Sequence, residues 1–320
     1  GPPAEARART ALSSYDRCMA TIAVGGASGL IGTALVRHLR DRGDTVLRLV
    51  RGAAVQPDEV GWNPAKDEIH LEPCAEVDTL VNLSGAPISH RWTAWRKRQI
   101  LLSRVRCTRT LARAATELGP HVALVSASAV GYYGDRGRER LTESSPPGSD
   151  WLADVVQQWE QATSEASEAG NRVALARTGL VVTPSGGALA PLMPLLKLGV
   201  ASPLGSGNQI WPWISLPDEV RAFTWLIDHP IAGPVNLAAP ATTTNAELIR
   251  ALAHAMRRTT FPIAVPVWAM RLVVGEFAER AVDSQDQVPQ VLLDSGFEFE
   301  HRTLDELAAW FVAKEDQDGR

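Results

Sequence analysis

The sequence predicts an α/β protein with a doubly wound parallel sheet and a small C-terminal lobe. The prediction rests first on residues 21–50, where a short apolar run, a glycine turn, an amphipathic stretch and a second apolar run follow one another. The pattern then recurs: strand-like runs lie at 78–84, 121–128, 172–177 and 234–239, and helical periodicity fills 93–118, 151–169, 217–228 and 245–258. Strands that alternate with helices pair in parallel, with helices on both faces of the sheet.

The composition argues against several classes of protein. A formal net charge of −4 provides no overall positive field to hold nucleic acid. The three cysteines and seven histidines are scattered, so we expect no disulfide framework and no metal site. No apolar run is long enough to cross a membrane, and residues 1–18 lack the apolar centre of a signal peptide. We therefore expect a soluble, cytoplasmic protein without a membrane partner, either a monomer or a homodimer.

Glycines between the first strand and the first helix predict a dinucleotide site. Gly26, Gly29 and Gly32 have the spacing G-x-x-G-x-x-G, and each has a steric task. The first allows the tight turn, the second lets backbone amides approach a pyrophosphate, and the third lets the helix pack closely on the strand. A flexible turn without a ligand is the alternative. The expected cofactor-binding residues of this turn are Gly26, Ser28, Gly29, Leu30, Ile31 and Gly32.

The residue at the end of the second strand favours NADP(H) over NAD(H). An NAD site usually has an acidic residue there, whose carboxylate accepts hydrogen bonds from the ribose hydroxyls. Here the position is Arg51. A guanidinium cannot accept those bonds but can bind a 2′-phosphate with two parallel donors, assisted by the hydroxyl of Ser28. An exposed arginine that serves only solubility is the alternative.

These observations predict how the chain is divided. We expect a Rossmann dinucleotide-binding domain made of 19–183 and 213–240, and a small substrate-binding lobe made of 184–212 and 241–320. The lobe is inferred from two regions that break the alternation, 184–215, rich in Gly, Pro and Ser, and the tail after 260. Residues 1–18 are polar, and we expect a disordered tail or a remnant of the expression vector there.

Seven stretches together resemble the extended short-chain dehydrogenase/reductases, in particular the epimerase-family subgroup that is nucleoside-diphosphate-sugar epimerase-like. The resemblance covers about Thr21 to Leu307. It rests on GGASGLIG (25–32), VNLSGAPI (81–88), RW followed by SR (Arg91, Trp92, Ser103, Arg104), SASAVGYYGD (126–135), RTGLVVTPSGGAL (177–189), GSGNQIWPWISLPD (205–218) and GF near Phe297.

The resemblance implies roles for several residues. It implies that Asn82, Ser84, Gly85 and Ala86 line the nicotinamide ribose, that Ser128 is the active-site serine, and that 184–215 and the tail close over a substrate. Ser126 and Arg104 join the expected cofactor-binding set. Each role has an alternative, because Asn and Gly can simply end a strand and the serines can cap the next turn.

One departure from the family pattern puts the usual chemistry in doubt. Active members of the superfamily pair a tyrosine with a lysine four residues later, and the lysine lowers the tyrosine pKa. Aligning Glu160 with the glutamate that commonly follows that lysine puts Leu152 and Val156 in the two positions. Neither side chain can move a proton. An acid or base must then come from bound water or from Tyr132, Tyr133, Asp135, Glu143 or Asp218.

We take Ser128, Tyr132 and Tyr133 as the catalytic candidates. The two tyrosines follow the serine in a loop bounded by glycines, so one of them can face the site, and burial as packing residues is the alternative. Asp218 begins a helix, where a carboxylate that stabilises the helix dipole is the alternative.

Two other stretches allow two interpretations. Residues 91–109 contain seven basic residues and two tryptophans, which suggests a nucleic-acid surface, but apolar residues at helical spacing favour a helix packed on the sheet with a charged outer face. Trp211 and Trp213 either wall a substrate pocket or fill the lobe interface.

The sequence thus supports two hypotheses. The first is an NADP(H)-dependent oxidoreductase or epimerase-like enzyme acting on a small or nucleotide-linked carbonyl or alcohol, by hydride transfer at the nicotinamide. The second is a catalytically silent NADP(H)-binding sensor or regulatory protein that lost the proton relay. In both, the expected ligands are NADP(H) and an unidentified small molecule.

Overall fold

The chain forms one large sheet that is parallel except at one edge. The computed structural model describes residues 19–88 and 91–318, so the expectation for residues 1–18 lies outside the described residues. The strand order is β12-β8-β6-β5-β1-β2-β3-β4, and only β4 runs antiparallel to its neighbour. The strands are β1 (Thr21–Gly25), β2 (Thr45–Arg51), β3 (Glu59–Asn63), β4 (Glu68–Ile69), β5 (Thr79–Asn82), β6 (Ala123–Ala129), β8 (Val173–Thr178) and β12 (Gly233–Leu237).

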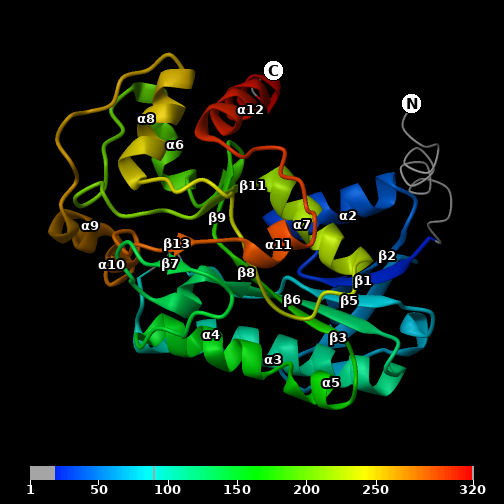
Figure 1. Ribbon diagram of the computed structural model, residues 1–320. Helices are drawn as coiled ribbons and strands as arrows, with labels where there is room; N and C mark the ends of the chain where they lie inside the picture. The colour runs from blue at the N-terminus through cyan, green and yellow to red at the C-terminus, as the bar shows by residue number, and fades with distance from the viewer. Residues whose placement is uncertain (1–18, 89–90, 319–320) are drawn as a thin grey trace, which may run out of the picture.

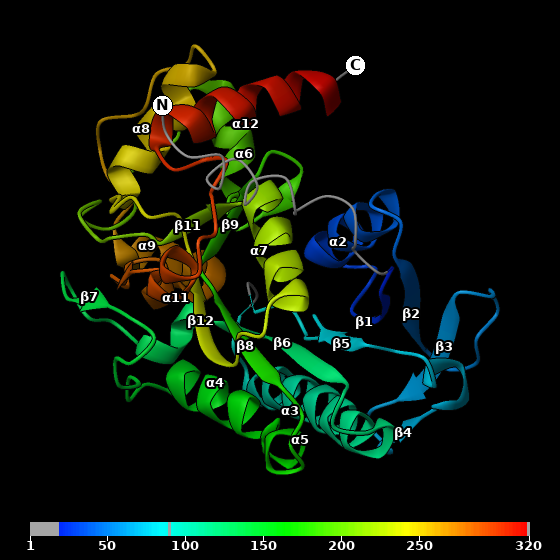
Figure 2. The ribbon, with the colours of Figure 1, turned by 45° about the vertical axis from the view of Figure 1, so that its right-hand side comes forward.

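Helices cover both faces of this sheet, so the predicted fold class is confirmed. Helices α3 (Ala94–Leu118), α4 (Trp151–Gln161) and α5 (Ser164–Glu168) lie on one face, and α2 (Leu30–Asp41) and α7 (Leu216–Asp228) lie on the other (Figures 1 and 2). The expected helix over 151–169 is two helices, because the chain turns at Ala162 and Thr163. None of the helices described is long and apolar enough to cross a bilayer.

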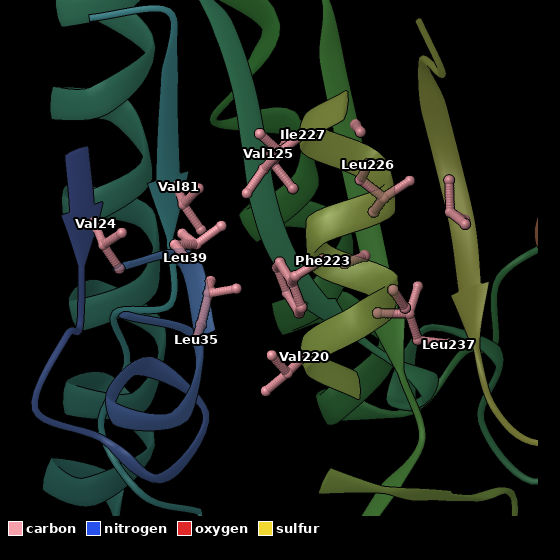
Figure 3. Close-up of a cluster of buried hydrophobic side chains, with 14 of the residues drawn as sticks. Val24, Leu35, Leu39, Val81, Val125, Val220, Phe223, Leu226, Ile227 and Leu237 are labelled. Carbon is pink, nitrogen blue, oxygen red and sulfur yellow. The ribbon is translucent and has the colours of Figure 1, made fainter. Parts of the chain in front are cut away.

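The core under α2 and α7 explains why these two amphipathic helices lie side by side. Figure 3 shows Leu35 and Leu39 of α2 facing Val24 and Val81 of the sheet, while Phe223 of α7 packs toward Val125. All six side chains are fully buried. Burying each such side chain contributes about 1.5–3 kcal/mol, so the apolar faces of the two helices hold them to the sheet.

A second set of elements lies beyond the carboxyl ends of the strands. It contains a small sheet of β9 (Leu180–Thr183), β10 (Gly186–Gly187) and β11 (Trp213–Ser215), and a strand pair of β7 (Arg140–Leu141) and β13 (Asp286–Gln287). Its helices are α6 (Met193–Leu198), α8 (Asn245–Ala255), α9 (Val267–Val274), α10 (Phe277–Arg280), α11 (Gln290–Asp294) and α12 (Leu304–Asp318). In the whole of the described chain, the short 3₁₀ turns are η1 (Glu72–Cys74), η2 (Val130–Tyr133) and η3 (Ala190–Leu192). The exact division of the chain into domain and lobe stays a prediction.

The structure decides between the two interpretations of Trp211 and Trp213. Both rings are buried in the apolar cluster of α6, α8 and α12. The Trp211 indole donates to the carbonyl of Ala281 at 3.1 Å, and the Trp213 indole donates to the hydroxyl of Thr243 at 3.0 Å. They fill the lobe rather than wall a pocket.

The structure also decides between the two interpretations of the basic stretch 91–109, and it favours a helix packed on the sheet. It enters α3, where Cys107 and Leu111 are buried in the cluster that holds this helix to the sheet. Thr93 caps the helix by accepting from the amide of Arg96 at 3.1 Å. Arg98, Arg106 and Arg109 are exposed on the outer face of this sheet-packing helix, whereas Arg104 lies against the segment after β5.

The carboxyl group of Glu219 is buried without a charged partner among the described residues. Glu219, in the first turn of α7, is fully inaccessible to solvent, and one of its oxygens accepts from the hydroxyl of Thr178 at 2.6 Å. Burial raises its pKa to about 8, and the Thr178 hydrogen bond opposes this only partly. The side chain is therefore protonated at neutral pH.

This burial predicts a pH dependence of stability. Because the folded pKa lies above the unfolded one, the unfolded state releases this proton first, and wild-type stability falls as pH rises from about 4.5 to about 8. Glu219→Gln removes this contribution, which is about 1.4 kcal/mol for each unit of pKa difference. We expect the melting temperature of Glu219→Gln relative to wild type to rise between pH 5 and pH 8.5. The exposed Glu168→Gln variant serves as the control, and a parallel pH profile for wild type and Glu219→Gln would contradict the assignment.

Candidate functional site

The glycine turn lies where the strand order reverses, at the junction of β1 and β5. Gly26 has φ +77°, and a Cβ there would lie 2.6 Å from the backbone carbonyl of Leu83. A Cβ on Gly32 would overlap the carbonyl oxygen of Gly26. The fold itself therefore requires these two glycines, because the turn is pressed between the end of β5 and the first turn of α2.

Gly29 differs from its two neighbours in the motif. Its φ of −75° and ψ of 176° suit any residue, and an added Cβ would meet no atom closer than 3.4 Å. No packing within the described part of the protein demands a glycine here. The bare backbone leaves room on the outer side of the turn, which fits the close approach of a pyrophosphate.

The start of α2 is the other half of this site. Its N-cap, Gly29, provides no side-chain hydrogen bond, and no acidic residue stands in the first turn. The helices α3, α4, α7 and α8 are capped by Thr93, Asp150, Ser215 and Thr244. The first amides of α2 thus remain available to an anion, and the helix dipole favours negative charge at this end.

The remaining turn residues lie beside these amides. Ser28 is exposed in the turn, and Ile31 packs on the core under α2. Leu30 begins α2 and contacts the small sheet, since an added Cβ on Gly186 would lie 3.5 Å from its side chain. The β9–β10 hairpin therefore borders the glycine turn.

The end of β5 places several predicted residues next to the turn. The side-chain amide of Asn82 is fully buried and donates to Thr108 at 2.8 Å and to Ser126 at 3.2 Å, while its oxygen accepts from the amide of Ser84 at 3.2 Å. The amide of Ala86 donates to the Ser103 hydroxyl at 3.0 Å. Asn82 and Ser126 thus shape the backbone of 82–86 and do not present their own polar groups.

Two arginines lie near this segment. Arg51 is exposed at the end of β2, and Arg104 donates to the carbonyl of Ala86 at 2.9 Å, with its guanidinium 5.0 Å from the centre of the Trp159 ring. Burial lowers the pKa of Arg104 to about 10. Burial raises the pKa of the Cys107 thiol, and both arginines oppose that rise. The two cations therefore lie close to one thiol, and Arg104 also lies against Gly85, whose added Cβ would be 3.2 Å from its guanidinium carbon.

The serine expected in the active site belongs to a buried polar network. The Ser128 hydroxyl donates to Glu160 at 2.6 Å, and Glu160 pairs with Arg177 through two hydrogen bonds of 2.8 and 2.9 Å. Burial acts to lower the pKa of Arg177, but the paired carboxylate outweighs it and raises that pKa. Because the Ser128 proton is directed to Glu160, its oxygen faces other groups as an acceptor.

The two tyrosines after this serine have different surroundings. The Tyr133 hydroxyl is fully buried, donates to Asn236 at 2.6 Å and accepts from Arg177 at 3.2 Å. The Tyr132 ring is half-buried and stacks on the Arg177 guanidinium, with 3.5 Å between the guanidinium carbon and the ring centre. The geometry favours the packing role for Tyr133 and leaves Tyr132 as the tyrosine nearer the surface.

Hydrophobic side chains occupy the place of the absent tyrosine and lysine. An added Cβ on Gly131 would lie 3.0 Å from Leu152 and 3.7 Å from Val156, so both side chains pack against the η2 backbone. No proton relay through α4 is available at this position.

The other acidic candidates already bind backbone amides. Asp135 accepts from Ser284 at 3.0 Å, and Glu143 accepts from Asn236 at 3.0 Å and from Val291 at 3.1 Å. Asp218 is fully buried and accepts from the amides of Glu300 and His301 at 2.8 and 2.9 Å. These contacts fix loops of the C-terminal segment, which is a structural task.

An aromatic cluster at the start of α4 could not be predicted from the sequence. Trp92 packs on Trp151 with ring centres 4.7 Å apart and on Phe277 at 6.0 Å. The Trp92 indole donates to the carbonyl of Ile88 at 2.8 Å. The three rings come from distant parts of the chain, so no local pattern could have revealed the cluster, whereas Arg177 was visible within the motif RTGL.

Comparison with known proteins agrees with this geometry. A family model described as "NAD dependent epimerase/dehydratase family" matches residues 22–238, and one described as "Domain of unknown function (DUF1731)" matches residues 265–311. An epimerase family protein of Mycobacterium tuberculosis is 42% identical over 298 residues, which cover 92% of this chain and 98% of that protein.

Two solved structures have the same overall arrangement. The crystal structure of the human epimerase family protein SDR39U1 with NADPH has a TM-score of 0.83 at 28% identity, covering 92% of this chain and 99% of that one. A nucleoside-diphosphate sugar epimerase of Corynebacterium glutamicum has a TM-score of 0.74 at 30% identity, covering 95% of this chain and 62% of that one.

The resemblance inferred from the motifs is thereby confirmed. The cofactor expected from the glycine turn and Arg51 is the one bound in the human relative, so the NADP(H) prediction is confirmed as well. By the match over 22–238 and the likeness to the mycobacterial protein, the chain belongs to the NAD dependent epimerase/dehydratase family, with a C-terminal DUF1731 domain.

Proposed function

We propose that this protein is an NADP(H)-dependent oxidoreductase that transfers a hydride between the nicotinamide and a carbonyl or alcohol carbon of a small substrate. The observation that carries the proposal is Gly29, a glycine that the surrounding protein does not require, at the uncapped start of α2. A bare backbone beside open helix amides suits a pyrophosphate. The NADPH in the human relative supports the same cofactor.

Each part of the cofactor then has residues to hold it. The turn from Gly26 to Gly32 takes the pyrophosphate, Arg51 takes the 2′-phosphate, and the segment 82–86 borders the nicotinamide ribose. Arg104, which contacts carbonyls and a ring and no carboxylate in the part of the chain described, offsets phosphate charge. When bound, the nicotinamide supplies or accepts the hydride.

The proton route does not pass through the positions of Leu152 and Val156. We propose that the Tyr132 hydroxyl, or a water beside it, exchanges the proton with the substrate oxygen, since Tyr132 is the tyrosine of this loop nearer the surface and its ring is held against the Arg177 guanidinium. Ser128, whose proton points to Glu160, accepts a hydrogen bond from a substrate hydroxyl or the nicotinamide amide. The cytoplasmic location stays a prediction.

One observation favours a second candidate function. Leu152 and Val156 replace the tyrosine and lysine that usually relay the proton, so a protein that only senses NADP(H) fits the site as well as a slow enzyme does. The two candidates share the cofactor site and differ in turnover.

The glycine turn provides a matched pair of variants. Gly32→Ala forces a methyl group onto the Gly26 carbonyl. We expect the free energy of unfolding to fall by at least about 1–3 kcal/mol. Gly29→Ala suits its backbone, so stability should change by no more than about 1 kcal/mol. Its methyl group would instead block the pyrophosphate and raise the Kd for NADPH about tenfold or more. Thermal unfolding and calorimetric titration measure the two effects, and unchanged NADPH affinity in Gly29→Ala would contradict the site.

Arg51 is expected to set the choice between the two nicotinamide cofactors. Arg51→Glu removes the charge-assisted bonds to the 2′-phosphate, each worth about 1.5–3 kcal/mol, and places a like charge beside it. We expect the Kd for NADPH to rise at least about tenfold, while the Kd for NADH stays level or falls. The exposed Arg302→Glu should change neither. An equal rise in the Kd for NADPH and for NADH would show that Arg51 does not recognise the 2′-phosphate.

Turnover distinguishes the enzyme from the sensor. With NADPH deuterated at the transferable position, we expect deuterium in the alcohol product of at least one member of a panel of aldehydes and ketones. Tyr132→Phe should lower kcat about tenfold or more with an unchanged Kd for NADPH, within the range that a general acid contributes. Tight NADPH binding without label transfer to any member of the panel would favour the sensor.

A further inference from the structure

The aromatic cluster of Trp92, Trp151 and Phe277 lies beside Leu152 at the start of α4. Trp151 is the first residue of α4 and precedes Leu152, which occupies the place of the missing tyrosine. Trp92 precedes α3 and contacts Trp151, while Phe277 begins α10 of the C-terminal segment and contacts Trp92. Three elements thus meet through their rings beside the carboxyl edge of the sheet.

The lining next to these rings is apolar as well. Leu152 packs on the Gly131 backbone and is half-buried, so part of its side chain stays accessible. The Trp92 and Trp151 rings and Phe277 are also half-buried. Apolar surface that remains accessible inside such a junction favours an apolar ligand, because burying it releases ordered water at little polar cost.

The cations nearest the cluster already have acidic partners. The Lys97 ammonium lies 2.6 Å from the Glu276 carboxylate, and stands over the Trp92 and Trp151 rings at 5.9 and 5.2 Å. The Arg280 guanidinium lies 2.8 Å from Asp150 and 3.0 Å from Asp283. A diphosphate would have to displace these carboxylates to bind here.

Several carboxylates surround the Arg280 guanidinium. Burial raises the pKa of Asp283 to about 7, Arg280 opposes the rise, and the carboxylates of Asp135, Asp150 and Glu279 add to it. Arg280 thus lies among several carboxylates, which disfavour a further anion directly beside it.

Two other arginines of this segment are used within the protein. Arg91 donates to the carbonyls of Leu272 and Val273, and Arg96 donates to the carbonyl of Pro87 at 3.4 Å, while the Nε of Arg96 is buried without a hydrogen-bond partner. These bonds tie the start of α3 to α9 and to the segment after β5. Arg96 keeps one unpartnered donor and Arg91 is engaged, so the described part of this segment offers no preformed pair of guanidinium groups for the two phosphates of a nucleoside diphosphate.

We propose that the substrate is a neutral, flat, apolar carbonyl compound or the corresponding alcohol, held between the Trp92–Trp151–Phe277 cluster and Leu152, and that it carries no nucleoside diphosphate. This inference rests on the proposed hydride-transfer function and narrows its substrate class. The corynebacterial relative is named a nucleoside-diphosphate sugar epimerase, and the inference gives this chain a different class of substrate.

Dead-end complexes test the inference without turnover. The NADP⁺ complex is titrated calorimetrically with 2-acetylnaphthalene, a ketone that cannot be oxidised there, and the NADPH complex with UDP-glucose, an alcohol that cannot be reduced there. We expect the ketone to bind and UDP-glucose to give no heat of binding. Binding of UDP-glucose, or no binding of the ketone, overturns the inference, whereas failure of NADP⁺ and NADPH to bind would overturn the proposed function instead.

Variants locate the ketone. Leu152→Glu places a carboxylate in the first turn of α4, where the helix dipole tolerates it, and should weaken ketone binding about tenfold or more with an unchanged Kd for NADP⁺. Trp92→Ala should do the same. Trp95→Ala, which removes a ring that is 66% exposed on the same segment, is the control and should leave ketone affinity within about twofold. Equal ketone affinity in wild type, Leu152→Glu and Trp92→Ala would place the ligand elsewhere and sink the proposal.

Discussion

The structure depends on the contact between the glycine turn and the end of β5. Gly26 lies against the Leu83 carbonyl and Gly32 against the carbonyl of Gly26, so three backbone segments meet with no side chain between them. This contact fixes how far α2 is inserted beside the sheet, and hence where its first amides point. The same backbone packing that holds the first βαβ unit together therefore also prepares the anion site.

A second constraint connects the sheet to the C-terminal segment. Glu160 and Arg177 form a buried ion pair, and Asn236 joins it through Tyr133. Gln287 of β13 donates to the carbonyl of Arg177 and to the side chain of Asn236. Removing one member of such a network leaves a buried charge or hydroxyl without its partner, which costs more than the intact network contributes to stability. Ser128 is held by the same network and is therefore an oriented acceptor.

Much of the cofactor half could be predicted from the sequence because its signals are local. The spacing of the glycines, the arginine at the end of β2 and the alternation of strands and helices all lie within short windows. The small sheet of β9, β10 and β11 could not, because its strands have two to four residues and depend on tertiary contacts. Other partners were equally hidden, since Glu160 lies 32 residues from Ser128, and Arg177 and Asn236 lie 44 and 103 residues from Tyr133. The absence of the tyrosine and lysine could be predicted from the sequence. The contacts among Trp92, Trp151 and Phe277 could not, because only the fold brings these rings together.

The bonds of Gln287 have a mechanical consequence. They lie on the inner side of the C-terminal segment, against the sheet, while α9 and α10 are held mainly at the rim, by Arg91 and by Lys97 with Glu276. Buried bonds resist opening more than exposed ones, because water cannot replace them until the whole contact separates. The attachment through β13 is therefore expected to open later than the exposed contacts at the α9–α10 edge.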